Sequence, residues 1–308
     1  MILLFGIPSE PPLELLHRRL GERGLPVFML NQRDFESASL SARVSEAGIE
    51  GRLVVGDRSV DLGRIIGVYA RPMDDRLLPE LDGEPPSSPR RLMCRALHDS
   101  IVAWLDVAPG RVVNRFREMG SNGSKPYQAQ AISRTGFDVP QTIVTNDPAH
   151  VHEFRRRHQR VVYKSVSAAR SVVQELLDTD LQRLEAVRAC PVQFQEFVPG
   201  FDVRVHVVGG QAIATRVDSP AVDYRYGEHG DGGTRLATFE LPADVAARCV
   251  DLTAHLGLSF SGIDLRFVPD GRVVCFEVNP SPAYSYYEEH TGQPISAVLA
   301  DYLAAALP

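Results

Sequence analysis

The sequence predicts a mixed α/β protein, and three observations lead to this fold class. Short apolar segments alternate with amphipathic helical segments through the first 110 residues, an order typical of a small α/β domain. Between residues 111 and 190, helices and strands continue to alternate. After Pro191 the chain is rich in strands, so α+β character follows the α/β part. The 308 residues therefore suffice for an N-terminal α/β domain at 1–110, a small central α/β domain at 111–190 and a C-terminal antiparallel-sheet domain at 191–308.

The elements of the first domain follow from its apolar runs. A helix is predicted at Leu13–Arg23, where apolar residues recur at helical spacing. A loop rich in proline and acidic residues at 79–89 precedes a second predicted helix, Arg90–Val107. The strands predicted for this domain are Ile2–Phe5, Val27–Leu30, Leu53–Val55 and Ile65–Tyr69.

The predicted strand Arg111–Asn114 opens the central domain. Ser124 is a plausible N-cap for the next helix, and Pro126 fits its first turn. A helix is also expected at Ala243–Leu256, and a final one at Ile295–Ala306. The predicted strands of this part are Gln141–Thr145, Val161–Lys164, Pro191–Val198, Asp202–Val208 and Gln211–Val217.

The segment from Phe260 to Pro280 predicts a hairpin with chemistry on one face. Asp270-Gly271 is a strong signal for a two-residue loop. With those residues at the turn, Pro269 opposes Arg272 and, counting back, Asp264 opposes Glu277. Residues two apart share a face, so Asn279 joins the two carboxylates. The other face then carries Ile263, Leu265 and Phe267 against Val274, Phe276 and Val278, and we expect it to face the core.

The acidic face of this hairpin calls for a cation. Two carboxylates directly opposite each other in a sheet destabilise the pair. A hard cation reverses that effect, and three oxygen ligands leave room for water and phosphate oxygens around Mg²⁺. The alternative is a solvated surface hairpin, or one in which Asp264 pairs with Arg266.

Two lysines stand apart from the other cationic residues. Lysine occurs only at positions 125 and 164, and arginine fills the other cationic positions. Lys164 ends an apolar strand, whereas Lys125 opens a helix, where its charge opposes the helix dipole unless an anion lies nearby. Each lysine alone is more often a surface residue, but together with the acidic hairpin they suggest a polyphosphate site.

The composition excludes some classes of protein. A net charge of −6 and a pI near 5.9 argue against general nucleic-acid binding. No apolar stretch approaches the length needed to span a bilayer, and the N-terminus reads as a strand and not as a signal peptide. Four widely spaced cysteines without metal-ligand spacing indicate reduced thiols, so we expect a cytoplasmic protein.

The chain resembles the ATP-grasp ligases. The matching residues run in the order of that superfamily and cover the last two thirds of the chain: Lys125, Lys164, Gln195–Arg204, Gly262–Asp264 and Glu277–Ser281. The resemblance implies an ATP-grasp fold with an N-terminal pre-ATP-grasp domain, and ATP and Mg²⁺ as cofactors. It also implies that both lysines contact phosphates, that Asp264, Glu277 and Asn279 ligate magnesium, and that the nucleotide is approached by Glu196, Phe197, Val198 and Asp202.

Within that superfamily the chain is similar to the peptide-modifying branch. This branch includes microviridin-type maturases, which install ester and amide macrocycles, and ribosomal-protein glutamate ligases. Segments that carry the likeness include Val68–Pro72, Asp223–Arg225 and Tyr287–Ile295. Ser165–Ser171 departs from the pattern of the superfamily, since this loop after the second lysine contains no glycine. The resemblance therefore implies no glycine-rich cradle for the phosphates at this loop, and Arg170 is the candidate substitute.

The activity implied is an ATP-dependent carboxylate ligase acting on a precursor peptide. A carboxylate becomes an acyl phosphate, and a hydroxyl or amine then displaces phosphate. The oxyanion formed in that step needs a fixed cation, for which Arg204, Arg216 and Arg225 are the candidates. Alternatives are a glutamate or small-molecule ligase and a phosphotransferase on the same fold. A homodimer also remains open, since many relatives form dimers.

Overall fold

The computed structural model describes residues 1–46, 48–166, 173–219 and 233–305. The chain divides into two compact units. Unit 1 comprises residues 1–119, 257–260 and 280–308, and unit 2 comprises residues 120–256 and 261–279. Unit 2 begins at residue 120, and the C-terminal residues return to unit 1. The domain boundaries predicted near residues 110 and 190 stay predictions.

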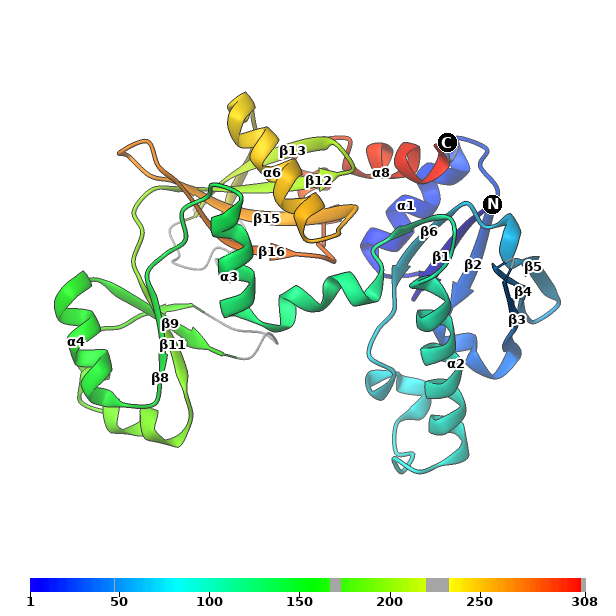
Figure 1. Ribbon diagram of the computed structural model, residues 1–308, viewed down its shortest axis with the longest axis horizontal. Coiled ribbons are helices and arrows are strands. Elements are labelled where there is room, and N and C mark those ends of the chain that lie inside the picture. The colour runs from blue at the N-terminus through cyan, green and yellow to red at the C-terminus, as the bar shows by residue number, and fades with distance from the viewer. Residues whose placement is uncertain (47, 167–172, 220–232, 306–308) are drawn as a thin grey trace. The chain divides into compact units, whose positions relative to one another are not determined.

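Unit 1 is built on a four-stranded parallel sheet (Figure 1). Its order is β2-β1-β6-β7, so the chain leaves β1 on one side and later returns to its other side. Each strand is short and strongly apolar, as expected for parallel strands that are covered on both faces. The strands are β1 (Ile2–Gly6), β2 (Val27–Asn31), β6 (Gly67–Arg71) and β7 (Arg111–Val113).

Helices lie on both faces of this sheet. Ile101, Trp104 and Leu105 of α2 share one apolar cluster with Leu3 and Phe5 of β1. α1 and α8 pack against each other and contact strands β1 and β6. None of the helices in the described ranges is long and apolar enough to cross a membrane. The helices of unit 1 are α1 (Pro11–Glu22), α2 (Pro89–Leu105), α7 (Ser285–Thr291) and α8 (Ile295–Ala304).

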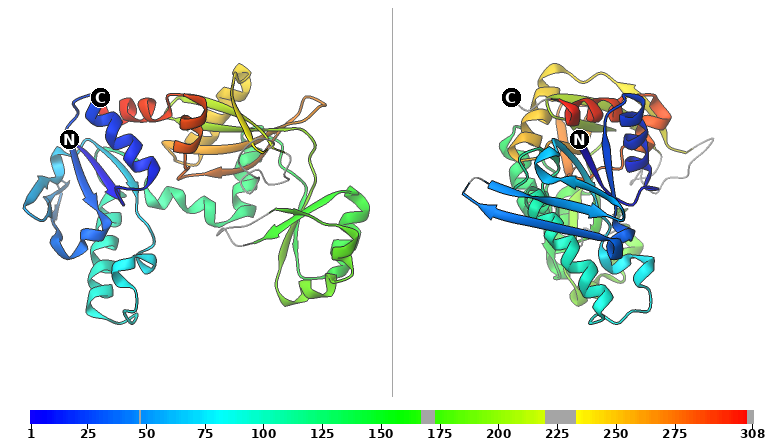
Figure 2. Two further views of the ribbon diagram at one scale, coloured as in Figure 1. Left: turned by 180° about the vertical axis from the view of Figure 1, so that it is seen from behind. Right: turned by 90° about the vertical axis from the view of Figure 1, so that its right-hand side faces the viewer.

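Unit 1 also contains an antiparallel ribbon that sequence analysis largely missed (Figure 2). Only Leu53–Val55 was predicted from it. Most side chains of β3 are exposed, and a strand with little buried surface gives little hydrophobic signal. The strands of the ribbon are β3 (Ala38–Ser45), β4 (Gly48–Val55) and β5 (Arg58–Asp61).

Short 3-10 turns occur in both units, at Gln32–Ser37, Leu62–Arg64, Asp75–Leu77, Pro79–Leu81, Phe116–Gly123 and Leu184–Ala189.

The first sheet of unit 2 has antiparallel pairs in the order β10-β9-β11-β8. Val151 and Phe154 of α4 pack against Phe194 of β11 and cover one face. The strands are β8 (Thr142–Thr145), β9 (Val161–Ser165), β10 (Gln174–Glu175) and β11 (Val192–Glu196). The helices beside them are α4 (Pro148–His158) and α5 (Asp178–Leu181).

The second sheet of unit 2 has the order β14-β13-β12-β15-β16. Helix α6 packs on β12 and β13, and α3 packs on β16. Strand β14 was not predicted, because most of its side chains are exposed. The strands are β12 (Phe201–Val208), β13 (Gln211–Asp218), β14 (Arg235–Phe239), β15 (Phe260–Phe267) and β16 (Val273–Asn279), and the helices are α3 (Lys125–Arg134) and α6 (Ala243–His255).

Asn114, just after β7, holds the backbone where the chain enters and leaves the β15–β16 hairpin. Its side-chain oxygen accepts hydrogen bonds from Ser259 N at 2.8 Å and Phe260 N at 3.0 Å. Its amide donates to Phe260 O and Pro280 O, both at 2.6 Å. Asn114 is 3% exposed, so these four bonds satisfy a buried amide completely.

Candidate active site

The acidic pair predicted on the hairpin is confirmed. Asp264 on β15 directly opposes Glu277 on β16, and Gly262 opposes Asn279. Because side chains alternate along a strand, Asp264, Glu277 and Asn279 share one face. Both carboxylates are partly buried, with side chains 15% and 19% exposed.

The route to this register differs from the one predicted. The turn has three residues, because Val268 N donates to Arg272 O at 3.0 Å and Gly271 N donates to Val268 O at 3.0 Å. A two-residue loop would close on Pro269, which has no N–H to donate. Gly271 instead adopts a left-handed conformation with φ of +90°, as the last residue of a three-residue loop often does.

A β-bulge after Asp264 restores the pairing that the longer turn displaces. Beyond the bulge, Leu265 opposes Cys275 and Phe267 opposes Val273. The extra residue on β16 is Phe276. The prediction that Val274 and Phe276 oppose the core residues of β15 was therefore wrong. Cys275 and Val273 take their places. Cys275 is fully buried, and burial raises the pKa of its thiol well above the ordinary value.

Each carboxylate of the pair is matched by a basic side chain of unit 2. Arg204 Nη1 on β12 donates to Asp264 Oδ1 at 2.7 Å, and Lys125 Nζ on α3 donates to Glu277 Oε2 at 2.8 Å. These charge-assisted bonds offset the repulsion between the two carboxylates. Lys125 thus finds the anion that its position at the start of a helix requires.

Gly262 makes the Arg204–Asp264 contact possible. A Cβ atom at Gly262 would lie 2.1 Å from Arg204 Nη2 and 2.6 Å from its Cζ. Arg204 is 6% exposed and tied to Asp264, so it has little freedom to move aside. Glycine at this position therefore allows the guanidinium group to pack closely against the backbone of β15.

Gln128, which sequence analysis did not single out, fixes β16 next to Glu277. Its amide donates to Val278 O at 2.8 Å and accepts from Val278 N at 3.0 Å. Gln128 lies three residues after Lys125, so both side chains project from one face of α3. Its only signal in the sequence is this helical spacing, which a polar residue on a surface helix shares.

The remaining predicted nucleotide residues are distributed over the two sheets of unit 2. Lys164 lies on β9 beside Gln193 of β11 and is 9% exposed, which is more buried than a projecting strand end would be. Glu196 ends β11, and its carboxylate accepts from Gln141 N at 2.9 Å. Phe197 N donates to Arg160 O at 3.0 Å, so that amide is committed to the protein.

Asp202 forms a two-bond ion pair with Arg266, at 2.9 and 2.8 Å. Arg266 also donates to Val198 O at 2.8 Å and so links two of the predicted nucleotide residues. The alternative in which Asp264 pairs with Arg266 is not observed, because Arg204 occupies that role.

Two of the three arginines proposed as oxyanion donors, Arg204 and Arg216, lie on opposite faces of their sheet. Arg204 contacts Asp264 and therefore lies on the acidic face. Arg216 directly opposes Val203, whose side chain points to the other face of β12 because neighbouring residues alternate. Arg216 instead pairs with Asp218 at 2.9 Å and stacks over the Phe201 ring. Arg225 lies outside the described residues, as do Arg170 and most of the loop at 165–171.

Two carboxylates and one amide oxygen on a single face fit Mg²⁺ that is shared with phosphates. Magnesium in nucleotide enzymes commonly uses one or two carboxylates together with phosphate oxygens and water. No group of three or more His, Cys, Asp and Glu residues suited to a metal occurs in the described ranges. The donor set therefore suits a metal that arrives with a nucleotide better than an all-protein cage.

No family model matches the sequence, but the chain is similar to solved structures and to curated sequences. The structure of the ATP-grasp ligase PsnB complexed with minimal precursor, Mg and ADP shares 28% identity and a TM-score of 0.81, over 98% of this chain and 96% of that chain. The macrocyclase MdnC from Microcystis aeruginosa MRC, bound with the precursor peptide MdnA, shares 22% identity and a TM-score of 0.80, over 98% and 99%. The latter likeness concerns the fold alone.

Curated sequences point to the same class. A probable α-L-glutamate ligase of Teredinibacter turnerae is 26% identical over 215 residues, or 66% of this chain and 70% of the relative. N-acetylaspartylglutamate synthase A of Mus musculus is 30% identical over 224 residues, or 68% and 58%. With the fold and the acidic hairpin, these likenesses define the chain as an ATP-grasp ligase, and the resemblance inferred from its motifs is confirmed. Among the solved ligases that it resembles over nearly its full length, several hold a peptide.

Proposed function

We propose that this ligase uses ATP and Mg²⁺ to join a side-chain carboxylate of a ribosomally made precursor peptide to a hydroxyl or amine, closing a macrocyclic ester or amide. The observation that carries the proposal is the acidic pair Asp264–Glu277, with Arg204 and Lys125 held against it. The likeness to PsnB over 98% of the chain supports a peptide as the substrate. A cytoplasmic location and a homodimer stay predictions.

Each residue of the site then has a distinct task. When bound, ATP supplies the phosphoryl group that activates the carboxylate, and Mg²⁺ offsets phosphate charge. Asp264, Glu277 and Asn279 would hold the metal. Lys125 and Lys164 would neutralise phosphate oxygens as point charges.

Adenine would be approached by Glu196, Phe197 and Val198. The hydrogen bonds at Phe197 N and Val198 O are already made within the protein. Recognition of the base would therefore use other backbone groups of this segment. Asp202 would act indirectly, because its ion pair holds Arg266 against Val198 O.

Arg204 is our choice for the cation that stabilises the oxyanion. Its guanidinium is nearly buried, and the bond to Asp264 fixes its orientation. A donor fixed before the reaction stabilises developing charge at no cost in reorganisation. Arg216 takes no part in this proposal, since it lies on the opposite face, and Arg225 remains a candidate from the sequence only.

The test is ADP release with a precursor peptide encoded by a neighbouring reading frame. Glu277→Gln should lower the rate of ADP release at least 100-fold, because the change removes one charge from the metal ligands. Glu240→Gln, at an exposed acidic position of unit 2, is the matched control and should keep full activity. Full activity in Glu277→Gln would contradict the proposal.

The names of the curated relatives favour a second candidate, a ligase that adds free glutamate to a carboxylate. Mass spectrometry separates the two, since ring closure removes one water per bond and glutamylation adds a glutamate residue. Hydroxylamine separates both from a phosphotransferase. A ligase forms an activated carboxylate that hydroxylamine traps as a hydroxamate, whereas a phosphotransferase gives none.

A further inference from the structure

A pocket of about 420 Å³ opens in unit 1 at the carboxyl ends of β1 and β6. These parallel strands are neighbours, and Gly6 at the end of β1 pairs with Arg71 at the end of β6. The sheet order β2-β1-β6-β7 makes this the point where the chain reverses its direction of winding. Open α/β sheets bind their ligands in the crevice at such a switch point.

An ion pair forms the polar side of this pocket. Arg71 Nε and Nη2 donate to Glu10 Oε1 at 2.9 and 2.6 Å, and Nη1 donates to Ser281 Oγ at 2.8 Å and to Pro282 O at 3.1 Å. The Arg71 side chain is 11% exposed, and that of Glu10 is 33% exposed. All three guanidinium nitrogens are therefore engaged with the protein, while the carboxylate still reaches the pocket.

This arrangement is poorly suited to an anion. The pocket lies at the start of α1, where backbone N–H groups commonly bind phosphate. The first two residues of α1 are Pro11 and Pro12, and neither has an N–H to donate. The Glu10 carboxylate occupies the same end of the helix, where the dipole stabilises its negative charge.

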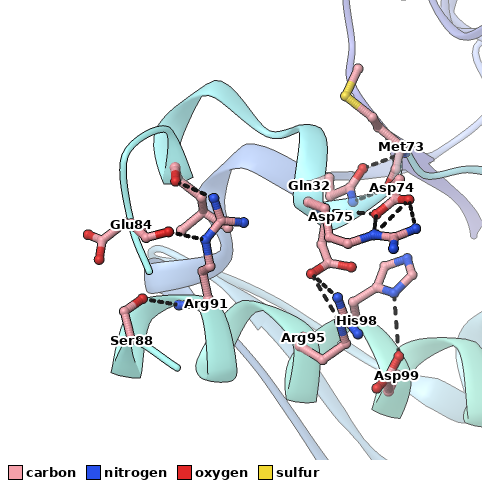
Figure 3. Close-up of polar contacts among 12 residues, drawn as sticks. Gln32, Met73, Asp74, Asp75, Glu84, Ser88, Arg91, Arg95, His98 and Asp99 are labelled. Carbon is pink, nitrogen blue, oxygen red and sulfur yellow. Dashed lines mark hydrogen bonds and ion pairs between the residues drawn. The ribbon is translucent and has the colours of Figure 1, made fainter. Parts of the chain in front are cut away.

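The other walls are apolar and held in place. Ile7, Pro72 and Met73 line the pocket beside Ser9. The backbone of Met73 is fixed by the buried side chain of Gln32, which donates to Met73 O at 2.6 Å and accepts from Met73 N at 2.7 Å (Figure 3). No residue in the described ranges donates a hydrogen bond to Glu10 Oε2.

We propose that this pocket binds a primary ammonium on an aliphatic stem, as a lysine side chain of the substrate peptide provides. The stem packs on Ile7, Pro72 and Met73, and the ammonium donates to Glu10 Oε2, which Arg71 orients. The identification of the amine with a peptide rests on the proposed function, but the ammonium site itself does not. The precursor peptide should therefore contain a lysine residue.

The experiment measures binding of small probes to the full chain without ATP, by ligand-observed NMR titration. Nα-acetyl-lysine methylamide presents the side-chain ammonium. Norleucine methylamide presents an α-ammonium, and Nα-acetyl-norleucine methylamide presents neither. The variants are Glu10→Gln, which removes the charge, and Ser9→Trp, which fills the pocket from an exposed position and leaves the ion pair intact. Glu14→Gln, exposed in the first turn of α1, and Glu277→Gln are controls.

We expect the acetyl-lysine probe to bind at least tenfold more tightly than acetyl-norleucine, and both Glu10→Gln and Ser9→Trp to remove that preference. The two controls should keep it. If the α-ammonium probe shows the same dependence on Glu10 and binds more tightly, the ammonium site stands and belongs to a chain terminus. Equal binding to the wild type and to both pocket variants would overturn the proposal. Because the measurement needs neither nucleotide nor turnover, it succeeds or fails independently of ligase activity.

Discussion

Replacing Lys125 by methionine should make the carboxylate pair bind a divalent cation more tightly in the absence of nucleotide. Lys125 Nζ lies 2.8 Å from Glu277 Oε2, and both side chains are less than one-fifth exposed. The ammonium therefore occupies one of the proposed metal ligands, and a cation that binds there must displace it. Methionine keeps most of the apolar stem and removes this competitor.

The expected size of the effect follows from the geometry. A unit charge pair at this distance attracts by about 6 kcal/mol at an effective dielectric constant of about 20. Desolvation and the flexibility of a partly exposed lysine cancel most of that. A net competition of about 1.4 to 2.8 kcal/mol corresponds to about 10- to 100-fold in the dissociation constant.

The assay is titration with Mn²⁺, with the free ion followed by electron paramagnetic resonance. Lys125→Met should bind Mn²⁺ about 10- to 100-fold more tightly than the wild type when no nucleotide is present. Its affinity for ATP should fall, because the proposed contact of Lys125 with phosphate is lost. Lys164→Met is the matched control, because it changes the only other lysine of the sequence. Lys164 lies on β9, in a different sheet from the acidic pair. This variant should leave the binding of Mn²⁺ in the absence of nucleotide unchanged. Unchanged or weaker Mn²⁺ binding in Lys125→Met would refute the reasoning.

Three further predictions concern packing. Gly262→Ala should destabilise unit 2 by about 1 to 3 kcal/mol in urea unfolding, because its Cβ overlaps the Arg204 guanidinium; an unchanged midpoint would contradict this. Gln128→Ala should lower the free energy of unfolding by about 1 to 3 kcal/mol in the same assay, because it leaves Val278 N and O buried without their partner. Gln128→Glu should recover part of that stability, because its carboxylate can still accept from Val278 N. A thiol reagent should label one cysteine in the native protein, Cys190, and four in denaturant, because the other three are buried; native labelling of a second cysteine would disprove the burial.

The acidic hairpin could be predicted because its information is local. Strand alternation and a turn signal were enough to oppose Asp264 and Glu277. The same reasoning predicted the turn one residue too short and missed the bulge, and the two errors cancelled. Bulges depend on how a strand packs against its neighbours, which no local pattern in Val273–Asn279 records.

The partners of the charged residues could not be predicted, because they come from distant segments. Arg204 and Asp264 are 60 residues apart, and Lys125 and Glu277 are 152 residues apart. Sequence analysis considered Arg266 for Asp264, since the two share a strand face, but Arg266 binds Asp202 instead. Arg216 is equally suitable by residue type, and only the register of β12 and β13 places it on the other face.

The bulge at Phe276 decides which side chain of β16 meets Asp264. With the observed three-residue turn, a regular ladder would continue from the Leu265–Cys275 pair to place Phe276 opposite Asp264, and Glu277 would then face the core. Deletion of Phe276 removes the extra residue, so Glu277 would still oppose Asp264 without a bulge. We therefore expect the acidic pair to tolerate loss of this residue better than any substitution that straightens the bulge at constant length.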